Sequence, residues 1–153
     1  GFTRHTYHLK NDEIKKFQDK WLSLTNNEDF MVQEFQKNIL STGEIAVMLF
    51  GGEYSHSVLK KAKKGDFRVQ DDFGGSVEKI NPSLEIIELA EKTVKSLKTI
   101  PLYARVDIIF DNVSNPVISE LELIEPELWF RFKEESAYKL AEIVKDFLNK
   151  LNC

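Results

Sequence analysis

The sequence predicts an α+β fold, with an antiparallel-rich mixed sheet flanked by helices. Two stretches are typical of β-hairpins, because each has a strand-like run, a group of turn residues and a second strand-like run. Three other stretches place apolar residues at steps of three and four, the spacing of an amphipathic helix. Helices with one apolar face need a surface to cover that face, so these patterns together favour helices packed on a sheet.

The first hairpin is expected over residues 44–61. Glu44–Phe50 is apolar after its first residue, which is typical of a buried strand. Gly51 and Gly52 can adopt the positive φ angles that a two-residue turn requires. One face of the returning strand should carry Tyr54, His56, Val58 and Lys60.

The second hairpin is expected over residues 102–124, and its charged residues are the main candidates for a functional site. If Phe110 faces Val117 across the turn, antiparallel pairing places Asp107 opposite Glu120 and Arg105 opposite Glu122. Like charges opposite each other destabilise a sheet, so the three acids need a cation, raised pKa values or ample solvent. A divalent ion such as magnesium would meet that need. A solvated strand face partly neutralised by Arg105 explains the hairpin equally well.

Helices are expected at three places, each with an apolar stripe. The first begins after Asn11 as N-cap and ends at Thr25–Asn27, and the second opens at Asn81-Pro82-Ser83 and ends before Pro101. Their stripes are Ile14, Phe17, Trp21 and Leu24, then Ile87, Ala90, Val94 and Leu97. The stripe of the C-terminal helix is Ala137, Leu140, Ala141, Val144, Phe147, Leu148 and Leu151, and all three are expected in the core. Between these elements, residues 30–35 are expected to be extended and 41–43 and 63–75 to be loops.

Composition excludes several classes of function. The 153 residues suffice for one domain with a sizeable core. A net charge of −4 gives no electrostatic case for a nucleic-acid partner, and no apolar run is long enough to span a membrane. The single cysteine, Cys153, cannot form an internal disulfide, so a cytoplasmic location is expected.

Three segments, in this order, resemble parts of one family. Residues 32–35 are similar to the hinge strand of ATP-grasp ligases, and residues 61–68 with Gly74-Gly75 are similar to their large loop. The acidic hairpin is similar to their metal-binding strands. The chain most resembles glutathione synthetases and the glutamate ligases that modify a ribosomal protein.

The resemblance implies an ATP-grasp C-terminal lobe over residues 30–153, with residues 1–29 a remnant of the smaller lobe. The rest of that lobe, with the lysines that grip the ATP phosphates, would belong to an N-terminal part of the same protein. A piece of this kind is expected to be inactive alone.

The family reaction activates a carboxylate with ATP, through an acyl phosphate, and an amine then attacks. The implied cofactors are ATP and Mg²⁺ or Mn²⁺, and the implied partners are small-molecule carboxylate and amine substrates. Arg68 would contact the transferred phosphoryl group, Lys60 would bind ATP, and His56 and Arg105 are candidates for substrate contact. Glu44 would bind the ribose, and the adenine edge would meet Gln33, Glu34, Phe35 and Gln36. The metal ligands would be Asp107, Glu120 and Glu122.

The chain departs from the family pattern at two of these positions. Glu122 stands where the third metal ligand is usually Asn, which adds a negative charge that Arg105 is placed to balance. Gln70 stands where the large loop usually has Asn. Two other functions stay open: a metal-dependent phosphoesterase that uses the same acids, and a non-catalytic nucleotide-binding module.

Overall fold

A computed structural model describes residues 5–63 and 75–152. The chain forms two compact units, one ending at Phe35 and one beginning at Gln36. The expected division into lobes at residues 1–29 and 30–153 stays a prediction. Within the described ranges, no helix is both long and apolar enough to cross a membrane.

The first unit is built around helix α1, Ile14–Thr25. Aromatic pairs support it, with ring centroids 4.8 Å apart for Tyr7 and Phe17 and 5.3 Å apart for Trp21 and Phe30. The expected N-cap at Asn11 is wrong: residues 11–13 form a turn in which the backbone N–H of Lys10 donates to the Glu13 carboxylate. Residues 30–35, which resemble a hinge strand, belong to no strand of the structure.

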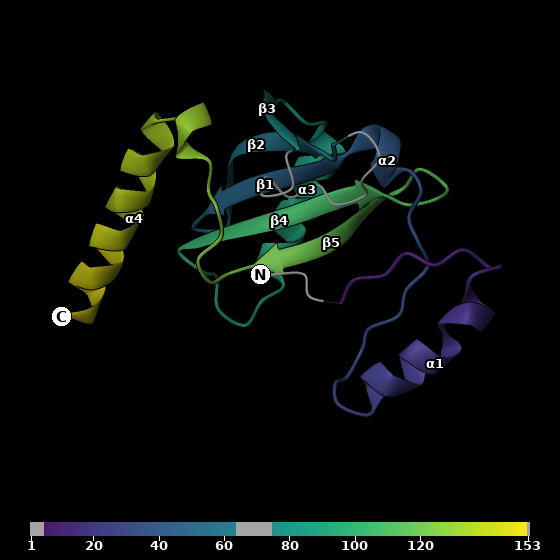
Figure 1. The fold of residues 1–153 in the computed structure, drawn as a ribbon. Coiled ribbons are helices and arrows are strands. Elements are labelled where there is room, and N and C mark those ends of the chain that lie inside the picture. The colour runs from purple at the N-terminus through teal and green to yellow at the C-terminus, as the bar shows by residue number, and fades with distance from the viewer. Residues whose placement is uncertain (1–4, 64–74, 153) are drawn as a thin grey trace. The chain divides into compact units, whose positions relative to one another are not determined.

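The second unit is a five-stranded sheet with helices, which confirms the α+β class (Figure 1). The strands lie in the order β3-β2-β1-β4-β5, and every pair among them is antiparallel. The strands are β1 Glu44–Phe50, β2 Glu53–Lys61, β3 Ser76–Ile80, β4 Tyr103–Phe110 and β5 Pro116–Glu122. The helices are α2 Ile39–Thr42, α3 Leu84–Lys95, the 3-10 turn η2 Phe130–Phe132 and α4 Glu135–Leu151.

The core divides between the two faces of the sheet, and β1, at the centre, is buried over its whole length. On one face, Val47 and Leu49 belong to a cluster that includes Ala90 and Val94 of α3, as the helix stripe predicted. Ile86, rather than Ile87, is the third buried residue of that helix. The opposite face has a smaller apolar cluster of Ala46, Met48, Val58 and Trp129. The charged residues discussed below therefore lie on the side that α3 leaves uncovered.

Two β-bulges set the side-chain directions on that face. In the acidic hairpin Phe110 pairs with Pro116, so the assumed pairing with Val117 is wrong by one residue. A bulge at Ser119 then restores the predicted pairs Asp107–Glu120 and Arg105–Glu122. In the first hairpin a bulge at Ser55 turns Tyr54 to the α3 side, away from the face expected for it.

Two further expectations about the second unit are wrong. Strand β3 was not predicted, because Ser76–Ile80 is short and its residues are exposed or half-buried. The stripe of α4 is not core, since Ser136 is the only buried residue of that helix, and Phe147, Leu148 and Leu151 are exposed. An amphipathic pattern reports an apolar face and does not report what covers it.

Gly43 is the position where the backbone most strictly requires glycine. It ends α2 with φ 74° and ψ −161°, a conformation almost restricted to glycine. A Cβ there would lie 2.4 Å from the Lys60 carbonyl oxygen. The expected loop at residues 41–43 is thus a short helix closed by a tight exit into β1.

Replacing Gly43 with alanine should lower the free energy of unfolding by about 2 kcal/mol or more, from backbone strain plus the clash. Gly51→Ala is the matched control. Gly51 also has a positive φ, 60°, but a Cβ there meets only the Ile143 side chain at 3.5 Å. Gly51→Ala should lower the free energy of unfolding by about 1 kcal/mol. Urea denaturation measures both, and equal losses would contradict the steric argument.

Candidate functional site

The candidate site is a row of charged side chains on the sheet face that α3 leaves uncovered. Strands β1, β2 and β4 contribute Glu44, Lys60, Arg105 and Asp107, each less than a tenth exposed. The strand register brings them together, because Glu44 pairs with Lys60 and Ala46 pairs with Asp107. Glu44, the first residue of β1, is buried.

Asp107 is the centre of this row. Its Oδ2 accepts a hydrogen bond from Lys60 Nζ at 2.7 Å and one from Arg105 Nη2 at 3.0 Å. Its Oδ1 accepts from Arg105 Nε at 2.9 Å. Lys60 Nζ also lies 2.6 Å from Glu44 Oε2. A fully buried carboxylate is thus held by two cations, and one of those cations is shared with a second acid.

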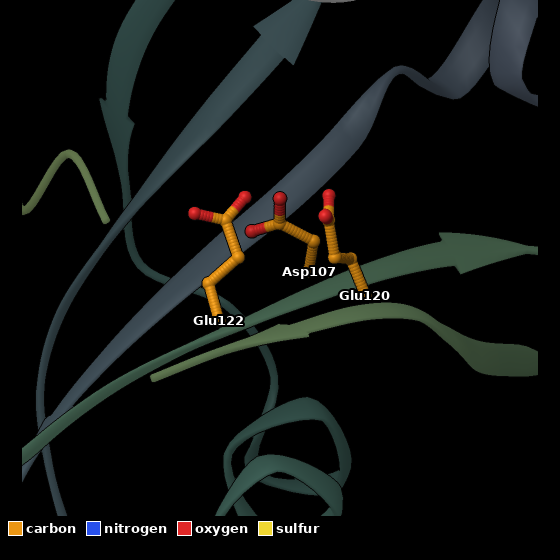
Figure 2. A group of neighbouring side chains, drawn as sticks. All are labelled: Asp107, Glu120 and Glu122. Atoms are coloured by element: carbon orange, nitrogen blue, oxygen red, sulfur yellow. The ribbon is translucent and has the colours of Figure 1, made fainter. Parts of the chain in front are cut away.

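Two further acids of β5 complete the cluster. Oxygen atoms of Asp107, Glu120 and Glu122 all lie within 4.8 Å of one another. Figure 2 shows Asp107 between the two glutamates, with the three carboxylates on one side of the sheet. Arg105 Nη2 donates to Glu122 Oε1, so the predicted pair across the ladder is present. The three acids range from buried Asp107, through half-buried Glu122, to exposed Glu120.

The cluster carries an excess of negative charge. Among the residues that the structure describes, four carboxylates, of Glu44, Asp107, Glu120 and Glu122, face two cations, Lys60 and Arg105, which leaves a formal charge of −2. Burial, followed by repulsion from Glu122 and Asp107, raises the pKa of Glu120. Between the ordinary and the raised value the folded chain holds more protons than the unfolded chain, so this group destabilises the fold as pH rises through that window.

The two cations keep their charge despite burial. Desolvation lowers the pKa of Lys60, but attraction and hydrogen bonds from Asp107 and Glu44 outweigh it, and the net pKa is raised. Arg105 shows the same balance, with Asp107 as its main partner, and its pKa is also raised. Each cation is therefore a permanent part of the site at neutral pH.

Two residues of the site were missed by sequence reasoning. The Ser119 hydroxyl, at the bulge, lies 2.6 Å from Glu44 Oε1, to which it donates. The Trp129 ring lies against both cations, with its centroid 5.2 Å from Arg105 Cζ and 5.8 Å from Lys60 Nζ. No spacing pattern pointed to either residue, because a bulge and an irregular segment place them.

His56 is a structural histidine in this arrangement. Its Nε2 lies 2.9 Å from the Leu128 carbonyl oxygen, which can only accept, so Nε2 carries the hydrogen. Burial is the main cause that lowers the pKa of His56, and the neutral ring accepts at Nδ1 from the Ser55 hydroxyl, 3.0 Å away. Contact with a substrate would require one of these bonds to break, and the substrate role of His56 stays a prediction.

The remaining predicted site residues belong to two groups, one in the described ranges and one outside them. Gln33, Glu34 and Phe35 belong to the first unit, and Gln36 to the second. The Gln36 side-chain oxygen accepts from the backbone N–H of Asn112 at 3.0 Å, which ties the start of the second unit to the turn of the acidic hairpin. Arg68 and Gln70, with most of the expected large loop, lie outside the described residues.

Lys60→Met should lower the free energy of unfolding by about 3 kcal/mol, because it leaves Glu44 and Asp107 buried beside an apolar side chain. Lys61→Met is the matched control on the next residue. Lys61 pairs with Glu78 at 3.0 Å, but both side chains are about half exposed, so its loss should cost less than about 1 kcal/mol. Urea denaturation at neutral pH compares them, and similar losses would contradict the buried position of Lys60.

The chain was compared with known proteins. A family model for the RimK-like ATP-grasp domain matches residues 10–128. Cycloserine biosynthesis protein DcsG of Streptomyces lavendulae is 26% identical over 136 residues, covering 82% of this chain and 44% of DcsG. This chain therefore spans less than half the length of that relative.

Solved structures show the same fold. The crystal structure of D-cycloserine synthetase DcsG matches with a TM-score of 0.65 and 24% identity, over 76% of this chain and 41% of that one. D-alanine–D-alanine ligase from Bacillus anthracis, solved with ATP, matches with a TM-score of 0.51 and 17% identity, over 93% and 56% of the two chains. ATP-grasp ligase PsnB, solved with Mg and ADP, matches with a TM-score of 0.50 and 15% identity, over 86% and 38%.

The family match covers most of the chain, and it takes in all five strands together with the acids of the cluster. The chain belongs to the RimK-like ATP-grasp family of ligases.

Proposed function

We propose that this chain is the ATP- and magnesium-binding portion of an ATP-dependent carboxylate–amine ligase that works through an acyl phosphate. The observation that carries the proposal is the cluster of Asp107, Glu120 and Glu122, with its excess of negative charge among the described residues, on the face of an ATP-grasp sheet opposite α3. Structural relatives solved with ATP, or with Mg and ADP, support the same ligands here.

The three acids suit a hard divalent ion. Their donors are all carboxylate oxygens, which Mg²⁺ and Mn²⁺ prefer, and the residual formal charge of −2 matches one such ion. Each carboxylate oxygen has two acceptor positions, and Asp107 Oδ1 accepts only the one bond from Arg105 within the described residues. Exposed Glu120 leaves the cluster open on one side. When bound, the ion would neutralise charge on the ATP phosphates.

The chain's own cations would then hold the anionic reactants. Lys60, fixed between Glu44 and Asp107, is assigned to an ATP phosphate, and Arg105 to the substrate carboxylate or the tetrahedral species derived from it. Arg68 is assigned to the transferred phosphoryl group, and Glu44 to the ribose. The adenine edge is assigned to Gln33, Glu34, Phe35 and Gln36.

The reaction needs no nucleophile from the protein. A carboxylate oxygen of the substrate attacks the terminal phosphorus of ATP, the bond to the bridging oxygen breaks, and ADP leaves. The amine then attacks the carbonyl carbon of the acyl phosphate, loses a proton and expels inorganic phosphate. Positioning and charge stabilisation supply the catalysis in this class of transfer.

Glu122, in place of the usual amide, changes the charge balance of the proposed site. Arg105 contacts Glu122 and Asp107 together, so one guanidinium offsets the additional carboxylate. This pairing keeps the residual charge at −2, the value that a single divalent ion neutralises.

The proposal is tested by thermal unfolding of the chain with and without Mg²⁺ and ATP. Ligands that bind only the folded state raise the midpoint, and the two together should raise it more than either does alone. Glu120→Gln should stabilise the metal-free chain by about 0.5 kcal/mol, because it relieves repulsion at a partly exposed site. The same change should remove at least about half of the magnesium-dependent shift.

Glu78→Gln, on exposed β3, is the matched control and should leave the magnesium shift unchanged. A magnesium shift that is equal in the Glu120→Gln and unmodified chains would refute the metal assignment. A shift with ATP that is the same with and without magnesium would instead favour a non-catalytic nucleotide-binding module. Phosphate release from ATP without any carboxylate substrate would favour a phosphoesterase.

A further inference from the structure

Trp129 occupies an unusual place on the site face. It lies in the irregular segment between β5 and η2, is 4% exposed, and packs with Ala46, Met48 and Val58. Its ring lies within 6 Å of both cations of the acid cluster, Lys60 and Arg105. A cation over an indole face at this distance is attracted by the ring quadrupole, and more strongly where water is excluded.

The backbone holds the indole in this place against a conformational cost. Trp129 has φ 45° and ψ 43°, the left-handed region that bulky residues rarely adopt. Its N–H donates to a Glu127 carboxylate oxygen at 2.9 Å, and its carbonyl accepts from the Phe132 N–H at 2.9 Å. The preceding carbonyl, of Leu128, accepts from His56 at 2.9 Å. Together these bonds fix the segment that carries the indole, and buried His56 supplies one of them.

The contact that matters is the ring face. The indole Nε1 is buried and has no hydrogen-bond partner among the described residues. Replacement by phenylalanine would therefore keep an aromatic face and remove a donor that is unpaired in this structure.

We propose that Trp129 is a positioning residue that anchors Lys60 and Arg105 independently of the carboxylates. Both cations share the oxygens of Asp107, and Arg105 also contacts Glu122. A divalent ion at the acid cluster uses oxygens of the same residues. The indole keeps the cations on the sheet face when those oxygens turn to the ion, so the ring contributes more to the metal-bound state. This inference rests on the metal-binding part of the proposed function.

The first test is titration of the chain with Mn²⁺, followed by the electron paramagnetic resonance signal of the free ion. Trp129→Leu should weaken Mn²⁺ binding by about threefold or more, and Trp129→Phe should stay within about twofold of the unmodified chain. Phe132→Leu is the matched control, because Phe132 belongs to the same apolar cluster and its ring contact is with Arg131 instead of the site cations. It should leave Mn²⁺ affinity unchanged.

A residue that only fills the core would behave differently. Both Trp129 variants would then lower the unfolding midpoint while Mn²⁺ affinity stayed the same, and that result would overturn the inference. A Phe variant that binds Mn²⁺ as weakly as the Leu variant would also overturn it.

A second measurement, without metal, separates this inference from the proposed function. Unfolding midpoints of Trp129→Leu, Arg105→Met and the double variant form a mutant cycle. If the ring anchors the guanidinium, the unfolding midpoint of the double variant falls by less than the sum of the falls in the two single variants. Additive falls in the midpoint would overturn the inference. Absence of Mn²⁺ binding to the unmodified chain would refute the metal assignment, and the cycle alone would then decide the role of Trp129.

Discussion

The buried carboxylate of Asp107 is the constraint on which the rest of the second unit depends. An ionised carboxylate inside a sheet is tolerated only when cations and hydrogen bonds replace its water. Lys60 from β2 and Arg105 from β4 supply that replacement, and Glu44 from β1 shares the lysine. The interaction crosses three neighbouring strands, so the register of the central sheet and the charge pattern of the site depend on each other.

The two faces of the sheet are packed differently. Apolar side chains on the other face are buried under α3, where Ala90 and Val94 allow close packing. The charged face has only a small apolar cluster around Trp129. One face of the sheet therefore holds most of the apolar core, and the other combines a few apolar contacts with the charged residues of the candidate site.

Much of this architecture could be predicted from local patterns. The apolar run of β1 and the glycine pair after it predicted the first hairpin, and Gly51 and Gly52 do have positive φ. The pairing of Asp107 with Glu120 was also predicted correctly, although for a reason that was partly wrong. The assumed register at Phe110 was off by one, and the bulge at Ser119 corrected it. A bulge shifts the two-residue alternation by one residue, and the short run Val117–Glu122 is too brief for that shift to be located from sequence.

Other features depended on tertiary context. The apolar stripe of α4 predicts a buried face, yet Phe147 and Leu151 are exposed. Periodicity does not identify a partner surface. Trp129 was overlooked, since a left-handed residue in an irregular segment has no periodic signature. The bonds of His56 to Ser55 and Leu128 were also beyond sequence reasoning, because an irregular segment far along the chain supplies the Leu128 carbonyl.

The bulge at Ser119 has a consequence for comparing related sequences. Between the turn and the bulge, Ile108 pairs with Ile118. Beyond the bulge, Asp107 pairs with Glu120, so β5 contains one residue more than β4 at this point. Deleting one residue from the Pro116–Ser119 segment would therefore remove the bulge, and Asp107 and Glu120 would still face each other. An alignment gap of one position in that segment is thus compatible with an intact site, whereas a gap between Glu120 and Glu122 would separate the two acids onto opposite faces.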